Sequence, residues 1–387
     1  MKWTNRGHEY EKYAGWFKNR KIWIYGAGYK GAVLYEQLKE LDCVEGFIDN
    51  NSVKKLENGY LGEKVITFRQ IKPNYKDRYI IVIAAQMPNA LDMAVHCRKA
   101  GFVDGYSLFY SEDFLRSYFD IYALYHNNMV YADFISMQVS SVCNLKCKGC
   151  LAFAPYDRHM RHFPIEEIKK SICEIFQNID YVNVLDLCGG EPFLSPMFTD
   201  AIEFVGENFR GKIGTLRTVT NGTVIPSEKL CEVLVKHEVT VLLDDYQEYV
   251  SLCNKNFSEV YRTLQDAGVK VVVNKVDNWI DLGIETGCKI THEEAVLQYD
   301  ECDNTRYAIR NSKLFACDYA SFASESEVYP ECQCEYLDVS EKRDKAEVLE
   351  FLKGYTVSGS SGMCQFCNGG PTINKHPIGV ATQMSRE

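Results

Sequence analysis

Ser141-Val-Cys-Asn-Leu-Lys-Cys-Lys-Gly-Cys150 is the most informative stretch of this 387-residue chain. It places Cys143, Cys147 and Cys150 in a C-x3-C-x2-C triplet. Three thiolates at this spacing can hold three irons of a [4Fe–4S] cube and leave the fourth iron open to a further ligand. An open iron distinguishes a reactive cluster from one that only carries electrons. The triplet therefore predicts an iron–sulfur site at which chemistry begins.

A second motif, Cys188-Gly-Gly-Glu-Pro192, follows later in the chain. Its glycines, Gly189 and Gly190, let the backbone approach a ligand closely. Glu191 can accept a hydrogen bond from an ammonium group, and Pro192 ends the preceding strand. Both motifs in this order arise by chance at about the 10⁻⁴ level in a chain with 16 cysteines. The pair therefore indicates a single functional site.

A structural zinc site is the alternative interpretation of the triplet, because C-x2-C is a common half of such sites. Zinc would need a fourth cysteine or histidine close to the triplet. The nearest candidates in the sequence are His159 and His162. This alternative predicts a scaffold without catalytic activity.

The two motifs together resemble those of the radical S-adenosylmethionine (radical SAM) superfamily. The resemblance implies that the triplet binds the cluster and that SAM chelates the unique iron through its amino and carboxylate groups. It also implies that Gly189, Gly190 and Glu191 flank the SAM amine. These expectations agree with the residue chemistry described above.

One position departs from the usual pattern of this family. The residue before the third cysteine is often aromatic and packs near the adenine, whereas here it is Gly149. Either Phe153 or Tyr156 is expected to fill that space.

Residues 131–295 alternate between strand and helix patterns, and each polar motif follows a strand. Serial βα units predict a parallel sheet that curls toward a barrel. Barrel enzymes assemble their active sites at the carboxyl ends of the strands. The expected fold class is α/β, and the pattern matches the partial (β/α)6 barrel of the radical SAM family. The expected strands are 134–140, 181–187, 214–219, 239–243 and 269–274.

Polar residues also follow the third and fourth of these strands. They are Asn221, Asp244 and Asp245. Asn221-Gly222 is an ordinary turn signal, and an aspartate after a strand is a common N-cap. The family resemblance implies that polar groups at these positions contact the SAM carboxylate and ribose. Asn221 and one of the two aspartates are therefore cofactor-binding candidates.

Residues 1–110 contain Gly26-Ala-Gly-Tyr-Lys-Gly31 between an apolar strand and a helical pattern. Asp49 follows at about the distance of a ribose-binding acid. Gly26, Gly28, Gly31 and Asp49 predict a small Rossmann-like α/β domain that binds a nucleotide or nucleotide-sugar. Too few strands follow for both halves of NAD, and a docking or structural role is the alternative. Residues 111–130 are expected to form a connecting helix.

Residues 296–387 contain a second cysteine set. Its members are Cys302, Cys317, Cys364 and Cys367. A hairpin ending in a cysteine, then a helix and a closing C-x2-C, resembles the twitch extension of radical SAM enzymes, a shortened SPASM domain. Four cysteines would complete an auxiliary [4Fe–4S] cube with no open iron. A zinc ribbon is the alternative, and Cys332 and Cys334 are either alternative ligands, part of a second cluster or bystanders.

Composition and charge narrow the class of protein further. The net charge of −10 argues against a broad nucleic-acid-binding face. No apolar run suggests a membrane span or a secretory segment, so the 16 cysteines indicate a reducing cytoplasm with metal sites. Cysteines in apolar patterns are expected to lie in the core: Cys43, Cys97, Cys173, Cys188, Cys231 and Cys253.

The resemblance implies reductive cleavage of SAM to methionine and a 5′-deoxyadenosyl radical, which takes a hydrogen atom from a small-molecule substrate. The Rossmann-like segment favours a sugar or nucleotide-sugar, and dehydrogenation or epimerisation as the outcome. A peptide-maturing enzyme is the alternative, because the twitch or SPASM extension is also typical of that class. An electron donor such as flavodoxin or ferredoxin is implied as a partner, and no further catalytic residue can be assigned.

Overall fold

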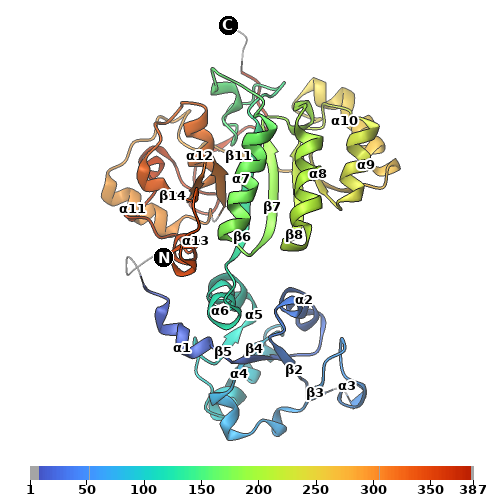
Figure 1. Ribbon diagram of the computed structural model, residues 1–387, viewed down its shortest axis with the longest axis vertical. Helices are drawn as coiled ribbons and strands as arrows, with labels where there is room; N and C mark the ends of the chain where they lie inside the picture. The colour runs from blue at the N-terminus through green and yellow to red at the C-terminus, as the bar shows by residue number, and fades with distance from the viewer. Residues whose placement is uncertain (1–7, 52, 305, 385–387) are drawn as a thin grey trace. The chain divides into compact units, whose positions relative to one another are not determined.

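The computed structural model describes residues 8–51, 53–304 and 306–384, in two compact units (Figure 1). One unit is Tyr10–Met129, and the other is Met1–Glu9 with Val130–Glu387. The predicted connecting segment 111–130 contains the single turn α5 (Ser111–Asp113), a π-helical turn (Phe114–Tyr118) and α6 (Phe119–Asn127). All three belong to the first unit, because α6 packs against α1 (Ala14–Phe17).

The unit Tyr10–Met129 is built on a five-stranded parallel sheet in the order β3-β2-β1-β4-β5. That order equals five strands of the six-stranded doubly wound arrangement. Its central strands are apolar on both faces, as expected for a buried parallel sheet. The strands are β1 (Lys21–Tyr25), β2 (Val44–Ile48), β3 (Val65–Ile66), β4 (Tyr79–Ile83) and β5 (Leu108–Tyr110). The remaining helices are α2 (Tyr29–Leu38), α3 (Val53–Asn58) and α4 (Asn89–Lys99).

The glycine loop joins β1 to α2, as the sequence predicts. Gly26 has φ +121°, a conformation that L side chains rarely adopt. A Cβ on Gly31 would lie 1.9 Å from the carbonyl oxygen of Gly26, so this glycine allows α2 to lie against the loop. A Cβ on Gly28 would have no heavy atom within 4 Å. Space therefore remains open at Gly28 for a ligand or a partner.

The second unit contains an eight-stranded sheet in the order β10-β9-β8-β7-β6-β12-β13-β14. The five strands from β6 to β10 are parallel, and β12 pairs with β6 in the same direction. The predicted hairpin is confirmed as β12–β13, with Asn311 and Ser312 at positive φ in its turn. The strands are β6 (Tyr131–Ser140), β7 (Tyr181–Gly189), β8 (Ile213–Thr220), β9 (Thr240–Asp244), β10 (Lys270–Asn274), β12 (Tyr307–Arg310), β13 (Lys313–Phe315) and β14 (Tyr336–Asp338).

Helices alternate with the parallel strands, so each βα unit expected from the sequence is present (Figure 1). α7 packs against α8, and α8 packs against α9. α10 starts at Ser251, about two turns before Ser258, where the sequence pattern places its start. The helices are α7 (Ile165–Asn178), α8 (Phe198–Phe209), α9 (Glu228–Lys236), α10 (Ser251–Asp266), α11 (His292–Glu301), α12 (Asp318–Glu325) and α13 (Lys345–Leu352). None of the helices within the described ranges is long and apolar enough to cross a membrane.

The two faces of the large sheet differ in burial. Alternate residues on one face are fully buried: Ile135, Leu185, Leu216 and Val241. The opposite face, called the open face below, carries Asp186, Cys188, Arg217, Leu242 and Asp244, and the last four are only partly buried. A sheet with one apolar and one polar face leaves the polar face available to a ligand. A cofactor and a substrate are therefore expected at the open face.

The expectation that these six cysteines lie in the core is wrong for Cys173, and Cys188 is only partly buried. Cys173 is exposed on α7, whereas Cys43, Cys97, Cys231 and Cys253 are buried. α7 is amphipathic, and Cys173 lies on its solvent side next to the buried Ile172. The apolar residues around Cys173 therefore indicated a wider buried face of α7 than the helix has.

Candidate active site

The cysteine loop starts where β6 ends and is held by the end of β7. The amide of Gly190 donates to the carbonyl oxygen of Ser140 at 2.8 Å, and the amide of Glu191 donates to that of Val142 at 2.8 Å. A Cβ on Gly189 would lie 2.2 Å from the Ser140 oxygen, and one on Gly190 would lie 2.4 Å from the Val142 oxygen. The two glycines therefore bring one strand end against the other.

Donor groups point at the sulfur of Cys143. The Leu145 amide lies 3.4 Å from this sulfur, and the Asn221 side-chain nitrogen lies 3.7 Å from it. All three cysteines of the triplet pack into one apolar cluster beside Cys253. Hydrogen-bond donors aimed at sulfur are the partners that a metal-bound thiolate uses. The local chemistry therefore fits an iron–sulfur cluster.

Burial raises the pKa of Cys143 and Cys147 to about 12 and also raises the pKa of Cys150. In each case desolvation of the thiolate is the main cause. The thiols are therefore protonated near neutral pH, and metal binding has to release these protons.

The zinc alternative finds little support in the geometry. His162 lies 2.9 Å from the hydroxyl of Ser140, and His159 lies 3.7 Å from Glu327. Within the described ranges, no three Cys, His, Asp or Glu side chains gather as ligands of one metal ion. Ligands of a cube bind different irons and lie farther apart, so this spacing is compatible with a cluster.

Glu191 joins the ends of β7 and β8. One carboxylate oxygen accepts from the Phe193 amide at 3.1 Å and from the Thr220 hydroxyl at 2.8 Å. The other oxygen accepts from the Asn221 amide at 2.8 Å. The residue is 0% exposed, and burial raises its pKa to about 7 although these bonds favour the charged form. Most of its hydrogen-bonding capacity is therefore used inside the protein.

Asn221 links this junction to the cysteine loop. Its side-chain nitrogen donates to Asn144 at 3.1 Å, and its side-chain oxygen accepts from the Thr223 amide at 3.0 Å. Asn144 in turn donates to the Thr223 hydroxyl at 2.8 Å. Sequence reasoning missed Asn144 and Thr223. The signal was weak, because each is a polar residue beside a motif.

The structure separates the two aspartates at the end of β9. Asp244 accepts from the Tyr246 hydroxyl at 2.6 Å and from the Asn274 side chain at 2.7 Å, and burial raises its pKa. Its charge also acts on Cys147. Asp245 instead accepts from the side chain of Gln247 at 2.9 Å. Asp244 is therefore the aspartate that faces the cysteine loop.

The open face carries an ion pair that the sequence analysis did not single out. Arg217 on β8 donates to both oxygens of Asp186 on β7, at 3.1 and 2.9 Å. The guanidinium also lies over the ring of Phe134, 5.0 Å from its centre. Half-buried Cys188 lies close to this pair, and burial raises its pKa well above the usual value. The available signal was two opposite charges inside strands that are otherwise largely apolar.

Gly149 stands at a position where the packing of Ile378 leaves no room for a side chain. It has φ +63°, and a Cβ here would lie 2.1 Å from the terminal carbon of Ile378. The Gly149 amide donates to the Tyr156 hydroxyl at 3.1 Å, which in turn donates to Glu285. Phe153 is 0% exposed and packs in a different apolar cluster. Of the two aromatic residues named for the space near the adenine, Tyr156 is the one with a hydrogen bond to Gly149.

The four cysteines of the second set line one cavity. They are Cys302, Cys317, Cys364 and Cys367. The Asn304 side chain donates to the sulfur of Cys317 at 3.2 Å, and the Gly369 amide donates to that of Cys367 at 3.3 Å. Cys332 and Cys334 do not line this cavity and act on each other. The geometry therefore fits one group bound by four thiolates.

The structure also brings Asp49 to the glycine loop of the first unit. One of its carboxylate oxygens accepts from the Ala27 amide at 3.3 Å, and the other accepts from the Asn51 amide at 2.8 Å. Lys55 donates to the Ala27 carbonyl oxygen, and Tyr60 donates to that of Gly28 at 3.3 Å. Asp49 therefore lies at the loop that contains Gly26, Gly28 and Gly31.

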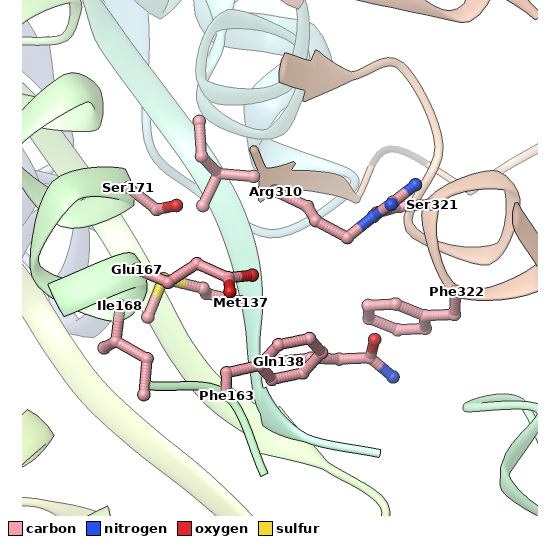
Figure 2. A pocket seen from close by; sticks show the side chains of 10 residues that line it. Met137, Gln138, Phe163, Glu167, Ile168, Ser171, Arg310, Ser321 and Phe322 are labelled. Carbon is pink, nitrogen blue, oxygen red and sulfur yellow. The ribbon is translucent and has the colours of Figure 1, made fainter. Parts of the chain in front are cut away.

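A further pocket lies between α7 and the β12–α12 region (Figure 2). Figure 2 shows Glu167 and Ser171 on one side and Arg310 and Phe322 on the other. Its volume is about 10 Å³, which is enough for about one water molecule. Arg310 also pairs with Glu325 at 2.8 Å. This pocket is too small for a cofactor or a substrate.

Residues 137–292 match the family model described as the radical SAM superfamily. This matched segment, less than half of the chain, is similar to the radical SAM superfamily domain. No curated protein matches the sequence.

Several solved structures are similar at low identity. BtrN in complex with AdoMet and 2-DOIA is 14% identical, with 62% of this chain and 93% of BtrN covered and a TM-score of 0.41. Native anSMEcpe with bound AdoMet is 16% identical, with coverage of 55% and 80% and a TM-score of 0.38. Streptococcus suis SuiB bound to precursor peptide SuiA is 16% identical, with coverage of 70% and 49% and a TM-score of 0.33.

The Glu191→Gln variant is expected to lose stability by roughly 1–3 kcal/mol at pH 5, because all three partners of this carboxyl group are donors and the amide nitrogen of glutamine, unlike the hydroxyl oxygen of the protonated acid, cannot accept a hydrogen bond. Burial raises the Glu191 pKa from 4.5 to about 7, so the native state holds this proton where the unfolded chain has lost it. The stability contributed by the wild-type residue therefore falls as the pH rises from 4.5 to 7. The difference in free energy of unfolding between the wild type and Glu191→Gln therefore becomes smaller over this range.

Urea unfolding of both proteins between pH 5 and 8 measures this gap. Glu259→Gln, an exposed change on α10, serves as the control and is expected to leave both stability and pH dependence unchanged. Parallel pH profiles for wild type and Glu191→Gln would contradict the raised pKa.

Proposed function

We propose that this protein is a radical SAM enzyme whose reactive cluster is held by Cys143, Cys147 and Cys150. The observation that carries the proposal is the pairing of the Gly-Gly-Glu strand end with the backbone that enters the cysteine loop. A cluster held by these residues would supply one electron for the reductive cleavage of SAM to methionine and a 5′-deoxyadenosyl radical. The protein's part is to hold SAM and the substrate in line and to exclude water.

In this proposal the large sheet is the partial (β/α)6 barrel of the family, and SAM lies at the carboxyl ends of its strands. The backbone of Gly189 and Gly190 lies beside the SAM amine, since the Glu191 carboxylate is largely occupied by protein donors. Asn221 and Asp244 lie closest to the cysteine loop and are assigned to the SAM carboxylate and ribose. Asp245 has no part in the site.

The substrate is proposed to lie on the open face, above Asp186 and Arg217. This face offers charged and hydrogen-bonding groups that suit a polyhydroxylated molecule such as a sugar or a nucleotide-sugar. Hydrogen abstraction leads to dehydrogenation or epimerisation of that molecule. A reducing partner of the flavodoxin or ferredoxin type supplies the electron.

The cavity lined by Cys302, Cys317, Cys364 and Cys367 is proposed to hold the auxiliary [4Fe–4S] cluster. The hairpin cysteine, Cys317, follows β13 of the large sheet, so the proposed twitch extension shares a sheet with the barrel. A cluster held by these four thiolates would accept the electron of the substrate radical or relay it. It is not needed to cleave SAM.

After anaerobic reconstitution, the protein is expected to contain about eight irons per chain, four at each cysteine set. Combined replacement of Cys143, Cys147 and Cys150 by Ala is expected to leave about four irons and to abolish SAM cleavage. Iron, sulfide and zinc analysis together with 5′-deoxyadenosine release measures both effects. Cys173→Ala, at an exposed cysteine, is the control and should keep the full iron content. Stoichiometric zinc in an iron-free wild type would overturn the proposal.

Removal of the auxiliary site is expected to separate SAM cleavage from substrate turnover. The Cys364→Ala, Cys367→Ala double variant should still release 5′-deoxyadenosine with dithionite as donor, because the sulfonium bond breaks at the other cluster. Turnover of the substrate should stop. A folded variant that keeps its first cluster and SAM but releases no 5′-deoxyadenosine would contradict this division of roles.

The unit Tyr10–Met129 is proposed to select the substrate or a partner and to take no part in radical generation. The glycine loop precedes the N-terminus of α2, and amides at a helix N-terminus attract phosphate. Asp49 lies at the same loop, within reach of a ribose hydroxyl group of a nucleotide held there. A nucleotide-linked sugar fits both features.

Calorimetry of the full-length protein with a panel of nucleotides and nucleotide-sugars tests this assignment. Gly28→Val is expected to abolish binding without unfolding the unit, because the added Cβ meets no heavy atom within 4 Å. Gly211→Val, at another glycine with free space around it, is the control. Absence of binding by the wild type would leave the docking role. Loss of SAM cleavage in Gly28→Val would contradict both roles.

A further inference from the structure

A segment distant in sequence, residues 377–384, lies against the cysteine loop. The Lys148 amide donates to the Thr382 carbonyl oxygen at 2.7 Å, and the Met384 amide donates to that of Lys146 at 2.7 Å. Cys147 and Gln383 face each other as an antiparallel bridge. The segment begins with β15 (Pro377–Ile378), which pairs with β11 (Trp279–Ile280). The backbone of the cysteine loop is therefore paired with the backbone of residues 382–384.

Apolar residues of the same segment close the space around Cys147. Val380 is 2% exposed and Ala381 is 0% exposed, and both pack in the cluster that contains Leu145 and Cys147. Ile378 occupies the position next to Gly149 where a side chain would otherwise stand. Cys147 itself is only 6% exposed. Residues 377–384 thus cover the Cys147 side of the loop.

Gln383 places a hydrogen-bond donor on the sulfur of Cys147. Its side-chain nitrogen lies 3.1 Å from this sulfur and also donates to the Ala381 carbonyl oxygen at 2.8 Å. Its side-chain oxygen accepts from the Lys146 amide at 2.9 Å. The reversed amide would place its nitrogen against that N–H, so the observed orientation is the one that satisfies every group. The Gln383 side chain is therefore held in place through both its oxygen and its nitrogen.

We propose that Gln383 is a positioning residue that raises the reduction potential of the cluster bound through Cys147. The inference rests on the proposed function, which places the cluster at the triplet. Reduction adds negative charge to a cluster and its thiolates, and an N–H donor at sulfur stabilises that charge. Loss of the donor therefore makes the cluster harder to reduce. Gln383 is itself exposed, but Cys147 is only 6% exposed, so the apolar residues of the segment limit the access of water that would replace the missing donor.

Redox titration of the reconstituted protein, followed by electron paramagnetic resonance, tests the proposal. Gln383→Leu is expected to keep its iron and to show a more negative midpoint potential, with a roughly tenfold lower ratio of reduced to oxidised cluster at a fixed potential, or about 59 mV for one electron. Gln383→Glu keeps an acceptor for Lys146 but places a carboxylate at the sulfur, so its shift should have the same sign and be larger. Gln265→Leu, at an exposed glutamine on α10, should leave the potential unchanged.

The outcomes separate this inference from the proposed function. A wild type without iron at the triplet overturns the proposed function. A wild type that binds iron and cleaves SAM, together with an unchanged potential in Gln383→Leu, overturns only the role of Gln383. Gln383→Met, which keeps the length and lacks the donor, replaces the leucine variant if that variant loses iron. Loss of iron from both variants overturns the tuning role and leaves Gln383 with a structural one.

Discussion

The rest of the site depends on two backbone hydrogen bonds between the end of β7 and the chain that enters the cysteine loop. They run from Gly190 to Ser140 and from Glu191 to Val142. Neither can form at this distance with a side chain on Gly189 or Gly190, because its Cβ would overlap a carbonyl oxygen. The glycines therefore act first on the protein's own backbone. The same backbone pairing places Gly189 and Gly190 beside the cysteine loop, where a ligand can approach them.

Polar side chains extend this junction across four segments. Glu191 ties β7 to β8, Asn221 ties β8 to the cysteine loop, and Gln383 ties that loop to residues 377–384. The bonds of Glu191 and Asn221 are buried or partly buried, where an unsatisfied partner would be costly. A loop with three cysteines is thereby held in one conformation by protein contacts alone. Such preorganisation is what a site for a metal cluster requires.

Much of the fold could be predicted from local pattern. The strands and helices from β6 to β10, the β12–β13 hairpin and the glycine loop of the first unit all occur where the sequence placed them. The prediction failed for the exposed Cys173 and for the start of α10, because apolar letters alone do not define the edges of a buried stripe. The pairing of β12 with β6 could not be predicted from local pattern either, because strand order depends on long-range packing.

The sequence by itself determined the identity and spacing of the cysteine triplet, the Gly-Gly-Glu stretch and the four later cysteines, because ligand chemistry is written in residue type and local order. Only the tertiary structure decided that Asp244 rather than Asp245 faces the triplet and that Asp186 pairs with Arg217. It also decided that Gln383 reaches Cys147 across 236 residues. These contacts join segments far apart in the chain, and their geometry is set by strand register and packing, to which no local pattern corresponds.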